Sequence, residues 1–325
     1  MITLVREGDV TTSPVVMDRV TRRFRDVVAV NDASLEVAPG TILGLIGPSG
    51  SGKTTMVRML TGTLAQTSGD LWVLGERPSR FRRETRERIG YMPQQFHLYP
   101  HLTTGENVAF CATLFGLFWW RRRRRVRQVL ELTQLYDARD RLAMDLSGGM
   151  QRRLSLACAL VHEPDVLFVD EPTAGLDPLL RQAVWEEFRR LRDTGHTLFV
   201  TTQSVSDAEY CDHVALLVRG TIVALGEPEE LRRAAFGGEV IEVRTRGAAP
   251  AGVVEKLPGV IDVQQPAKDR LVVIAEDAGA TTPRIADALN AWGSPVLTAD
   301  KYEPTFDDVF VELVERSTEE PEAAS

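Results

Sequence analysis

The amino-acid sequence predicts an α/β fold followed by a smaller α+β domain. Three short apolar runs end in turn or polar residues, as strands buried on both faces of a parallel sheet do: Thr41–Ile46, Val166–Val169 and Thr197–Val200. Apolar residues recur at helical spacing in Val126–Leu135 and Leu179–Leu191. Strands and helices therefore alternate through the first two thirds of the chain.

A change of composition after Phe236-Gly237-Gly238 indicates a second domain. Its expected elements are a strand at Val240–Arg244, a helix, strands at Val260–Gln264 and Leu271–Ala275, a helix at Pro283–Trp292 and a strand at Val296–Ala299. This order is typical of a split βαβ, ferredoxin-like domain. We expect domains over 14–235 and 239–315, with a disordered acidic tail over 316–325.

Composition excludes several classes of function. The 325 residues carry a net charge of -8, which argues against a general affinity for nucleic acid. The three cysteines stand far apart and predict neither a zinc site nor a disulfide framework. No stretch reaches the roughly 20 apolar residues that cross a bilayer, and no secretory signal is apparent. We expect a cytoplasmic protein that contacts membranes through a partner.

A glycine-rich loop predicts a nucleotide site. It follows the strand that ends at Ile46 and fits the GxxxxGK[ST] pattern: Gly47, Pro48, Ser49, Gly50, Ser51, Gly52, Lys53, Thr54. Glycines let backbone N–H groups surround the β-phosphate, Lys53 reaches the β and γ oxygens, and the Thr54 hydroxyl can bind magnesium. Thr55 is expected at the α-phosphate. The loop alone fits many NTPases.

Two adjacent carboxylates follow the apolar run at Val166. Asp170 can hold the magnesium shell, and Glu171 can orient or deprotonate an attacking water. With Lys53, they predict hydrolysis of a nucleoside triphosphate.

Further motifs resemble the ATP-binding subunits of ABC transporters. Leu146-Ser147-Gly148-Gly149-Met150-Gln151 is similar to that family's signature, Gln94 lies in a stretch similar to its glutamine loop, and Asp177 lies in one similar to its aspartate loop. The resemblance covers about Val15–Leu231. It implies a phosphate-loop ABC ATPase core with a helical insert over about 96–160, ATP and Mg²⁺ as ligands, and Thr54, Gln94 and Asp170 around the metal.

The resemblance also implies a homodimer. Ser147, Gly148 and Gly149 would close on the ATP of the opposite copy, and Asp177 would contact that copy; a capped turn before a helix is the alternative for the three signature residues. Phe24 stands where the family has an aromatic residue stacked on adenine. A phenylalanine at the edge of the core is the alternative there.

The sequence departs from the family at the switch position. Thr201-Thr202-Gln203 stands where Thr-Thr-His is usual. Glutamine can position water but carries no proton near neutral pH. We expect Gln203 to keep the positioning role and hydrolysis to depend weakly on pH.

Two segments of the insert allow alternative interpretations. Its aromatic and apolar residues either dock on a membrane subunit or pack the insert's own core: Phe96, Tyr99, Leu102, Phe115, Phe118. The run Arg121–Arg125 is either a solvated helix start or a contact for lipid headgroups.

The ending Tyr302–Phe310, with Gly149-Met150 and Gln203, is similar to exporter-type subunits for drugs, lipids or polysaccharides. The resemblance implies an ATPase subunit on the cytoplasmic face of the membrane, attached to a separate membrane-spanning subunit. An importer subunit and a soluble ABC-type ATPase are the alternatives. No nucleic-acid partner is expected.

Overall fold

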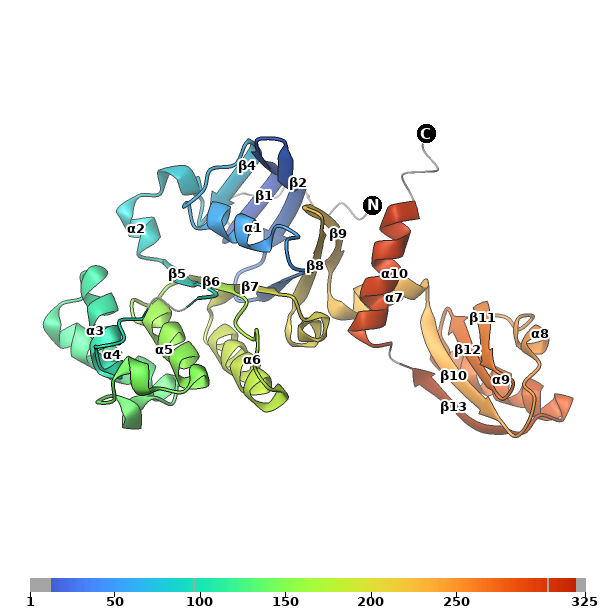
Figure 1. Cartoon of the computed structure of the whole chain (residues 1–325). Helices are drawn as coiled ribbons and strands as arrows, with labels where there is room; N and C mark the ends of the chain where they lie inside the picture. Colours follow the sequence, from blue (N-terminus) through green and yellow to red (C-terminus); the bar gives the residue numbers. More distant parts are fainter. Residues whose placement is uncertain (1–12, 96–97, 303, 320–325) are drawn as a thin grey trace. The chain divides into compact units, whose positions relative to one another are not determined.

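The computed structural model describes residues 13–95, 98–302 and 304–319. It divides into two compact units, one through Leu225 and one from Gly226; Figure 1 shows their elements. The division falls before the expected boundary at 235, because helix α7 (Pro228–Phe236) packs against helix α10 (Phe306–Glu319) of the second unit.

A six-stranded sheet forms the centre of the first unit. Its strand order is β5-β6-β7-β3-β8-β9, and β5, β6, β7, β3 and β8 pair in parallel. The bounds are β3 Ile42–Ile46, β5 Ile89–Met92, β6 Val166–Asp170, β7 Thr197–Thr202, β8 His213–Val218 and β9 Thr221–Gly226. Every residue of β3, β6 and β7 is buried, which explains their continuous apolar sequences. The three strands predicted from the sequence are confirmed.

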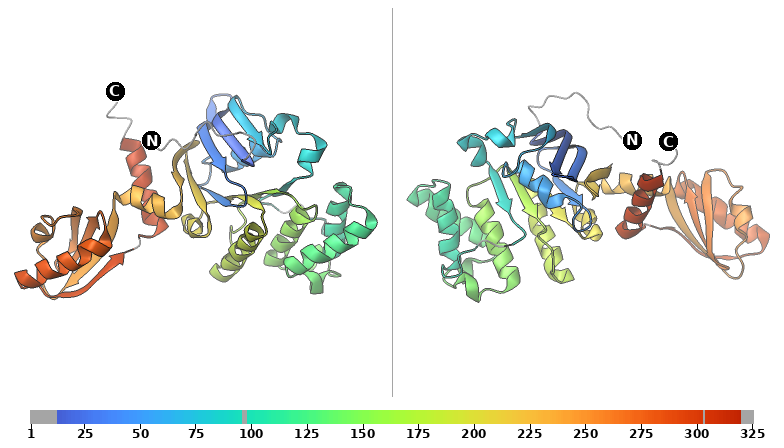
Figure 2. Two further views of the ribbon diagram at one scale, coloured as in Figure 1. Left: turned by 180° about the vertical axis from the view of Figure 1, so that it is seen from behind. Right: turned by 45° about the horizontal axis from the view of Figure 1, so that its top comes forward.

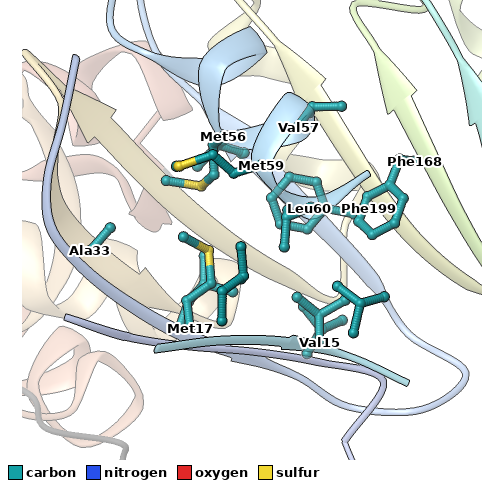
Figure 3. Packing of buried hydrophobic residues seen from close by; sticks show 14 of the residues in the cluster. Val15, Met17, Ala33, Met56, Val57, Met59, Leu60, Phe168 and Phe199 are labelled. Atoms are coloured by element: carbon teal, nitrogen blue, oxygen red, sulfur yellow. The ribbon is translucent and has the colours of Figure 1, made fainter. Parts of the chain in front are cut away.

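A second, antiparallel sheet was not predicted. It has the order β2-β1-β4, with β1 at Val15–Phe24, β2 at Val27–Val37 and β4 at Ser68–Val73. Helix α1 (Lys53–Leu60) packs against it with Met56 and Met59, while Phe168 and Phe199 of the central sheet belong to the same core (Figure 3). The helix that follows the glycine-rich loop is thereby held between two sheets.

The remaining helices of the first unit include those of the expected helical insert. There, α3 and α4 lie beside α5 (Figure 2). The α-helices are α2 Arg83–Arg86, α3 Thr104–Leu114, α4 Trp119–Leu132, α5 Gly148–Leu160 and α6 Pro178–Asp193; the 3-10 turns are Pro78–Arg80, Tyr136–Ala138, Ala143–Asp145 and Val205–Tyr210. Helix α4 ends before the predicted Leu135, because Gln134 turns to a φ of 56°. Within the described ranges, no helix is both long and apolar enough to span a bilayer.

The second unit has the predicted split βαβ topology. Strands β10 (Glu239–Thr245), β11 (Val260–Ala267), β12 (Arg270–Ala275) and β13 (Val296–Tyr302) form one antiparallel sheet in the order β11-β12-β10-β13. Helices α8 (Ala251–Val254) and α9 (Ala278–Trp292) connect them. Helix α9 begins before the predicted Pro283, because the Asp277 carboxylate caps it by accepting from the N–H of Ala280.

The expected disordered tail is wrong for residues 316–319, and residues 320–325 lie outside the described residues. Helix α10 continues through Glu319. The Arg316 side chain donates to Glu312 one turn earlier and to the carbonyl of Ala234 on α7. These contacts, together with the buried Phe306 and Val309, stabilise a helix in a segment whose acidic composition suggested disorder.

Candidate nucleotide-binding and hydrolysis site

The glycine-rich loop connects β3 to α1, and its glycines are required by close backbone contacts. A Cβ on Gly47 would lie 2.1 Å from the carbonyl oxygen of Leu217. Gly52 has a φ of 112°, and its Cβ would lie 2.3 Å from the carbonyl oxygen of Ala29. The loop is also bound by backbone hydrogen bonds from Gly47 to Thr202 and from Gly220 to Ser51. Neighbouring strands therefore fix its path.

Helix α1 begins without a side-chain cap, since Gly52 occupies the N-cap position. The first N–H groups of any helix lack partners within the helix, so an anion can bind them. Pro48, Ser49 and Gly50 are exposed above this helix start, and Thr54 and Thr55 lie half-buried in its first turn. Nearby, the buried Ser51 hydroxyl has no hydrogen-bond partner among the described residues. The loop therefore offers unsatisfied donors to a phosphate.

The Lys53 ammonium is buried, with 4% of the residue exposed. It donates to the carbonyl oxygens of Gly47 at 2.8 Å and Pro48 at 3.0 Å, and it lies 3.3 Å from Oε1 of Glu171. Carbonyls and a carboxylate therefore balance its charge inside the loop.

Glu171 gathers the polar side chains that the sequence placed in separate motifs. Its Oε2 accepts hydrogen bonds from the side-chain amides of Gln94 at 3.0 Å and Gln203 at 2.6 Å. Its backbone has a φ of 50° and is held by Thr201, whose carbonyl and hydroxyl both accept from the Glu171 N–H. A left-handed residue other than glycine stores strain, which is common at functional sites.

Asp170 lies beside the loop and has the ligand chemistry of a magnesium site. Its Oδ1 accepts from the hydroxyls of Thr201 at 2.5 Å and Thr54 at 3.4 Å. Burial and the Asp170 charge raise the pKa of the neighbouring Tyr91. In the described part of the chain, no three His, Cys, Asp or Glu side chains gather as a metal cluster. Oxygen donors suit Mg²⁺, which in such sites takes its other ligands from phosphates and water.

Asp207 was missed by the sequence analysis. It is fully buried, and its carboxylate accepts from the hydroxyls of Thr173 at 2.8 Å and Thr202 at 2.6 Å and from the Trp185 indole at 2.9 Å. Thr173 follows Glu171 closely and Thr202 precedes Gln203, so this carboxylate ties together the loops after β6 and β7. No motif pointed to it, because Thr173 and Trp185 are distant in sequence.

The residues similar to the signature lie at the start of α5 and make no hydrogen bond to the loop at Gly47–Thr54 within the described structure. The Ser147 hydroxyl caps α5 by accepting from the N–H of Met150, and Ser147 and Gly148 are exposed. Beside Gly149 lies a cavity of about 190 Å³ lined by α5 and α6. Asp177 caps α6 by accepting from two N–H groups and is exposed.

Phe24 ends strand β1 and lies outside the buried core, with its ring 4.4 Å from the Arg22 guanidinium. Its stacking on adenine stays a prediction. The insert's aromatic residues have different environments. Phe115 is half-buried and stacks on His162 at 3.6 Å, Tyr99 contacts Phe110, and Phe118 is exposed. Phe96 lies outside the described residues.

The two units of the chain match two different families of known proteins. Residues 30–174 match the ABC transporter family, and residues 226–314 match the C-terminal domain of DrrA1-3-like ATP-binding proteins. A Burkholderia orbicola protein named Nod factor export ATP-binding protein I is 34% identical over 95% of this chain and 99% of its own length. The chain belongs to the ABC transporter family of ATP-binding proteins. The resemblance inferred from the motifs is confirmed.

Two further matches cover a smaller share of this ABC protein. An Escherichia coli protein named probable multidrug ABC transporter ATP-binding protein is 38% identical over 65% of this chain, a match that spans 37% of the relative's length. The ATP-binding cassette MJ0796, solved as a dimer bound to ADP and phosphate, superposes with a TM-score of 0.60 and 26% identity over 66% of this chain and 98% of its own. The relatives therefore support the fold and nucleotide binding of the first unit.

We predict that Asp207→Ala leaves three buried donors without their acceptor and destabilises this ABC protein by about 3–5 kcal/mol, as loss of a buried charged acceptor does. Urea unfolding measures the change. The exposed Asp193→Ala, on α6, is the control and should change stability by less than about 0.5 kcal/mol. An Asp207→Ala protein as stable as the control would contradict the role assigned to the carboxylate.

Proposed function

We propose that this chain binds and hydrolyses ATP to power export of a drug-like, lipid or polysaccharide substrate through a separate membrane subunit. The convergence of Lys53, Gln94 and Gln203 on Glu171 carries the proposal, because it gathers nucleotide-loop and switch residues around one carboxylate. Two relatives named for multidrug transport and Nod factor export support the direction of transport.

The mechanism assigns each group a task. ATP phosphates lie against the N–H groups of the loop and α1, and Lys53 turns from Glu171 to the β and γ oxygens. Thr55 contacts the α-phosphate, and Phe24 stacks on the adenine. Gln203 then orients a water whose oxygen attacks the γ-phosphorus, and the Glu171 carboxylate accepts its proton. The bond between the γ-phosphorus and the bridging β-phosphate oxygen breaks, and ADP and inorganic phosphate are the products.

Mg²⁺ would be held by Thr54, Asp170 and Gln94 together with phosphate oxygens and water. When bound, it neutralises charge on the phosphates. In Gln94, the side-chain oxygen is available for this task, since its amide nitrogen donates to Glu171.

A second copy of the chain completes the site in this proposal. Ser147 and Gly148 are exposed and Gly149 is half-buried at a helix start, the kind of position that binds anions, yet they make no described hydrogen bond to their own phosphate loop. In a homodimer they would contact the γ-phosphate held by the partner, and Asp177 would lie at the interface. The chain would work peripherally on the cytoplasmic face of a membrane, without nucleic acid.

We predict that Glu171→Gln retains ATP binding but lowers turnover about 100-fold or more, because it removes the proton acceptor and keeps the side chain's size. In ATP the variant should accumulate as a dimer, which light scattering after gel filtration detects. The control is Glu187→Gln, another buried glutamate, whose pKa is raised by burial. That control should turn over normally. Undiminished turnover in Glu171→Gln would refute the assignment.

Turnover of the wild type should vary little between pH 6 and 8, because Gln203 does not titrate. The variant Gln203→His should gain activity as pH rises through about 6.5, because the imidazolium present below that pH would reduce the basicity of Glu171. Single-turnover rates across this range measure both profiles. A sharp titration near 6.5 in the wild type would be incompatible with the role given to Gln203.

Purification from native membranes tests transport itself. We expect this chain to be accompanied by one integral protein of several membrane spans, and the pair to show higher ATP turnover than the chain alone. A solute-binding protein required for that turnover would indicate import. Stimulation by nucleic acid without an integral partner would indicate a soluble ATPase.

A further inference from the structure

The start of helix α4 exposes three consecutive aromatic side chains. Phe118, Trp119 and Trp120 are 74%, 66% and 62% exposed. The nearby Phe115 stacks on His162, whereas these three side chains are exposed. Exposed apolar residues are ordinary when they occur singly, whereas adjacent large aromatics indicate a contact surface.

Arginines continue the same helix. Arg121 and Arg125 pair with Glu163, but Arg123 and Arg124 are exposed and form no ion pair or hydrogen bond within the described structure. The first turn of α4 has no acidic residue. Although partial burial raises it, the pKa of Glu163 is lowered by the hydrogen bond from Arg121 and the charges of Arg125 and Arg124, so this carboxylate offsets part of the repulsion. One carboxylate is outnumbered by five consecutive arginines, and the repulsion that is left among like charges one turn apart has an energetic cost. An external anion would remove that cost.

We propose that Phe118, Trp119, Trp120, Arg123 and Arg124 form an aromatic-basic patch that inserts into the headgroup region of an anionic lipid bilayer. Tryptophan is favoured at this depth because its ring is apolar and its N–H is polar. The unpaired guanidinium groups would bind lipid phosphates from beside the rings. The patch attaches the chain directly to the bilayer, in addition to any attachment through a membrane subunit.

Charge favours a bilayer over other occupants. The whole chain carries -8, so attraction to an anionic surface must come from a local group of cations, which this patch supplies. A second copy would bring the same unpaired arginines together, and like charges facing each other at an interface are costly.

The patch is tested with the full-length chain, without ATP or membrane subunit, so that failure of the transport proposal cannot affect the result. Vesicles of phosphatidylcholine alone are compared with vesicles containing about 30% phosphatidylglycerol, a content that gives a negative surface potential. We expect sedimentation with the anionic vesicles only, decreasing as salt screens the charges. Lipids brominated on their acyl chains should quench tryptophan emission.

Two double variants separate the contributions. Arg123→Gln/Arg124→Gln should weaken binding to anionic vesicles on the order of 30-fold, from the usual contribution of each juxtamembrane cation. Trp119→Ala/Trp120→Ala should abolish quenching by the brominated lipids. Matched controls lie in the second unit: Trp292→Ala, whose ring is also 66% exposed, and the exposed pair Arg246→Gln/Arg284→Gln. Both should bind as the wild type does.

Equal binding to both kinds of vesicle, or wild-type binding by either patch variant, would overturn the proposal. The proposal would also be overturned if the wild-type chain did not bind vesicles and the Trp119→Ala/Trp120→Ala variant no longer bound its membrane subunit. The patch would then be a protein interface. Circular dichroism and ATP turnover of every variant should match the wild type, which shows that the folded chain is being compared.

Discussion

The ion pair between Lys53 and Glu171 is the contact on which the site depends. Both side chains are buried, so each charge relies on the other, and removing one partner of such a pair typically costs about 3–5 kcal/mol. Lys53 is fixed by α1 and Glu171 by the turn after β6, so the pair joins the two parts of the fold that must act together. The γ-phosphate of ATP would compete with Glu171 for the same ammonium. Nucleotide binding would therefore release the carboxylate for proton transfer.

Much of this site could be predicted because its residues lie in short, contiguous motifs. The phosphate loop follows β3, Asp170 is the last residue of β6, and Glu171 follows it. Parallel strands bring their carboxyl ends to one edge of the sheet. Asp207 could not be predicted in the same way, because its donors come from three separate segments and only the folded chain brings them together. The geometry around Glu171 likewise required the structure, since no sequence pattern specifies which amides reach one oxygen.

The fold was predictable where apolar periodicity was strong and less so where packing decides. Strands β3, β6 and β7 and the ferredoxin-like topology follow from apolar runs and their order. The antiparallel sheet of β1, β2 and β4 has mixed burial and was missed. Helix α10 contains both buried apolar residues and acidic ones, and its contact with α7 outweighs the composition that suggested disorder.

The Arg125 side chain has a mechanical consequence. It donates to the carbonyl oxygens of Leu160 and Val161, which end helix α5, and thereby fastens α4 to that end. Helix α5 has 13 residues and is therefore about 20 Å long, with Ser147 at its opposite end. A helix of this length moves as a rigid body. A displacement of α4 would therefore tilt α5 and move Ser147 at its other end. A force on α4 could in this way be transmitted to the phosphate that Ser147 would contact in the proposed dimer.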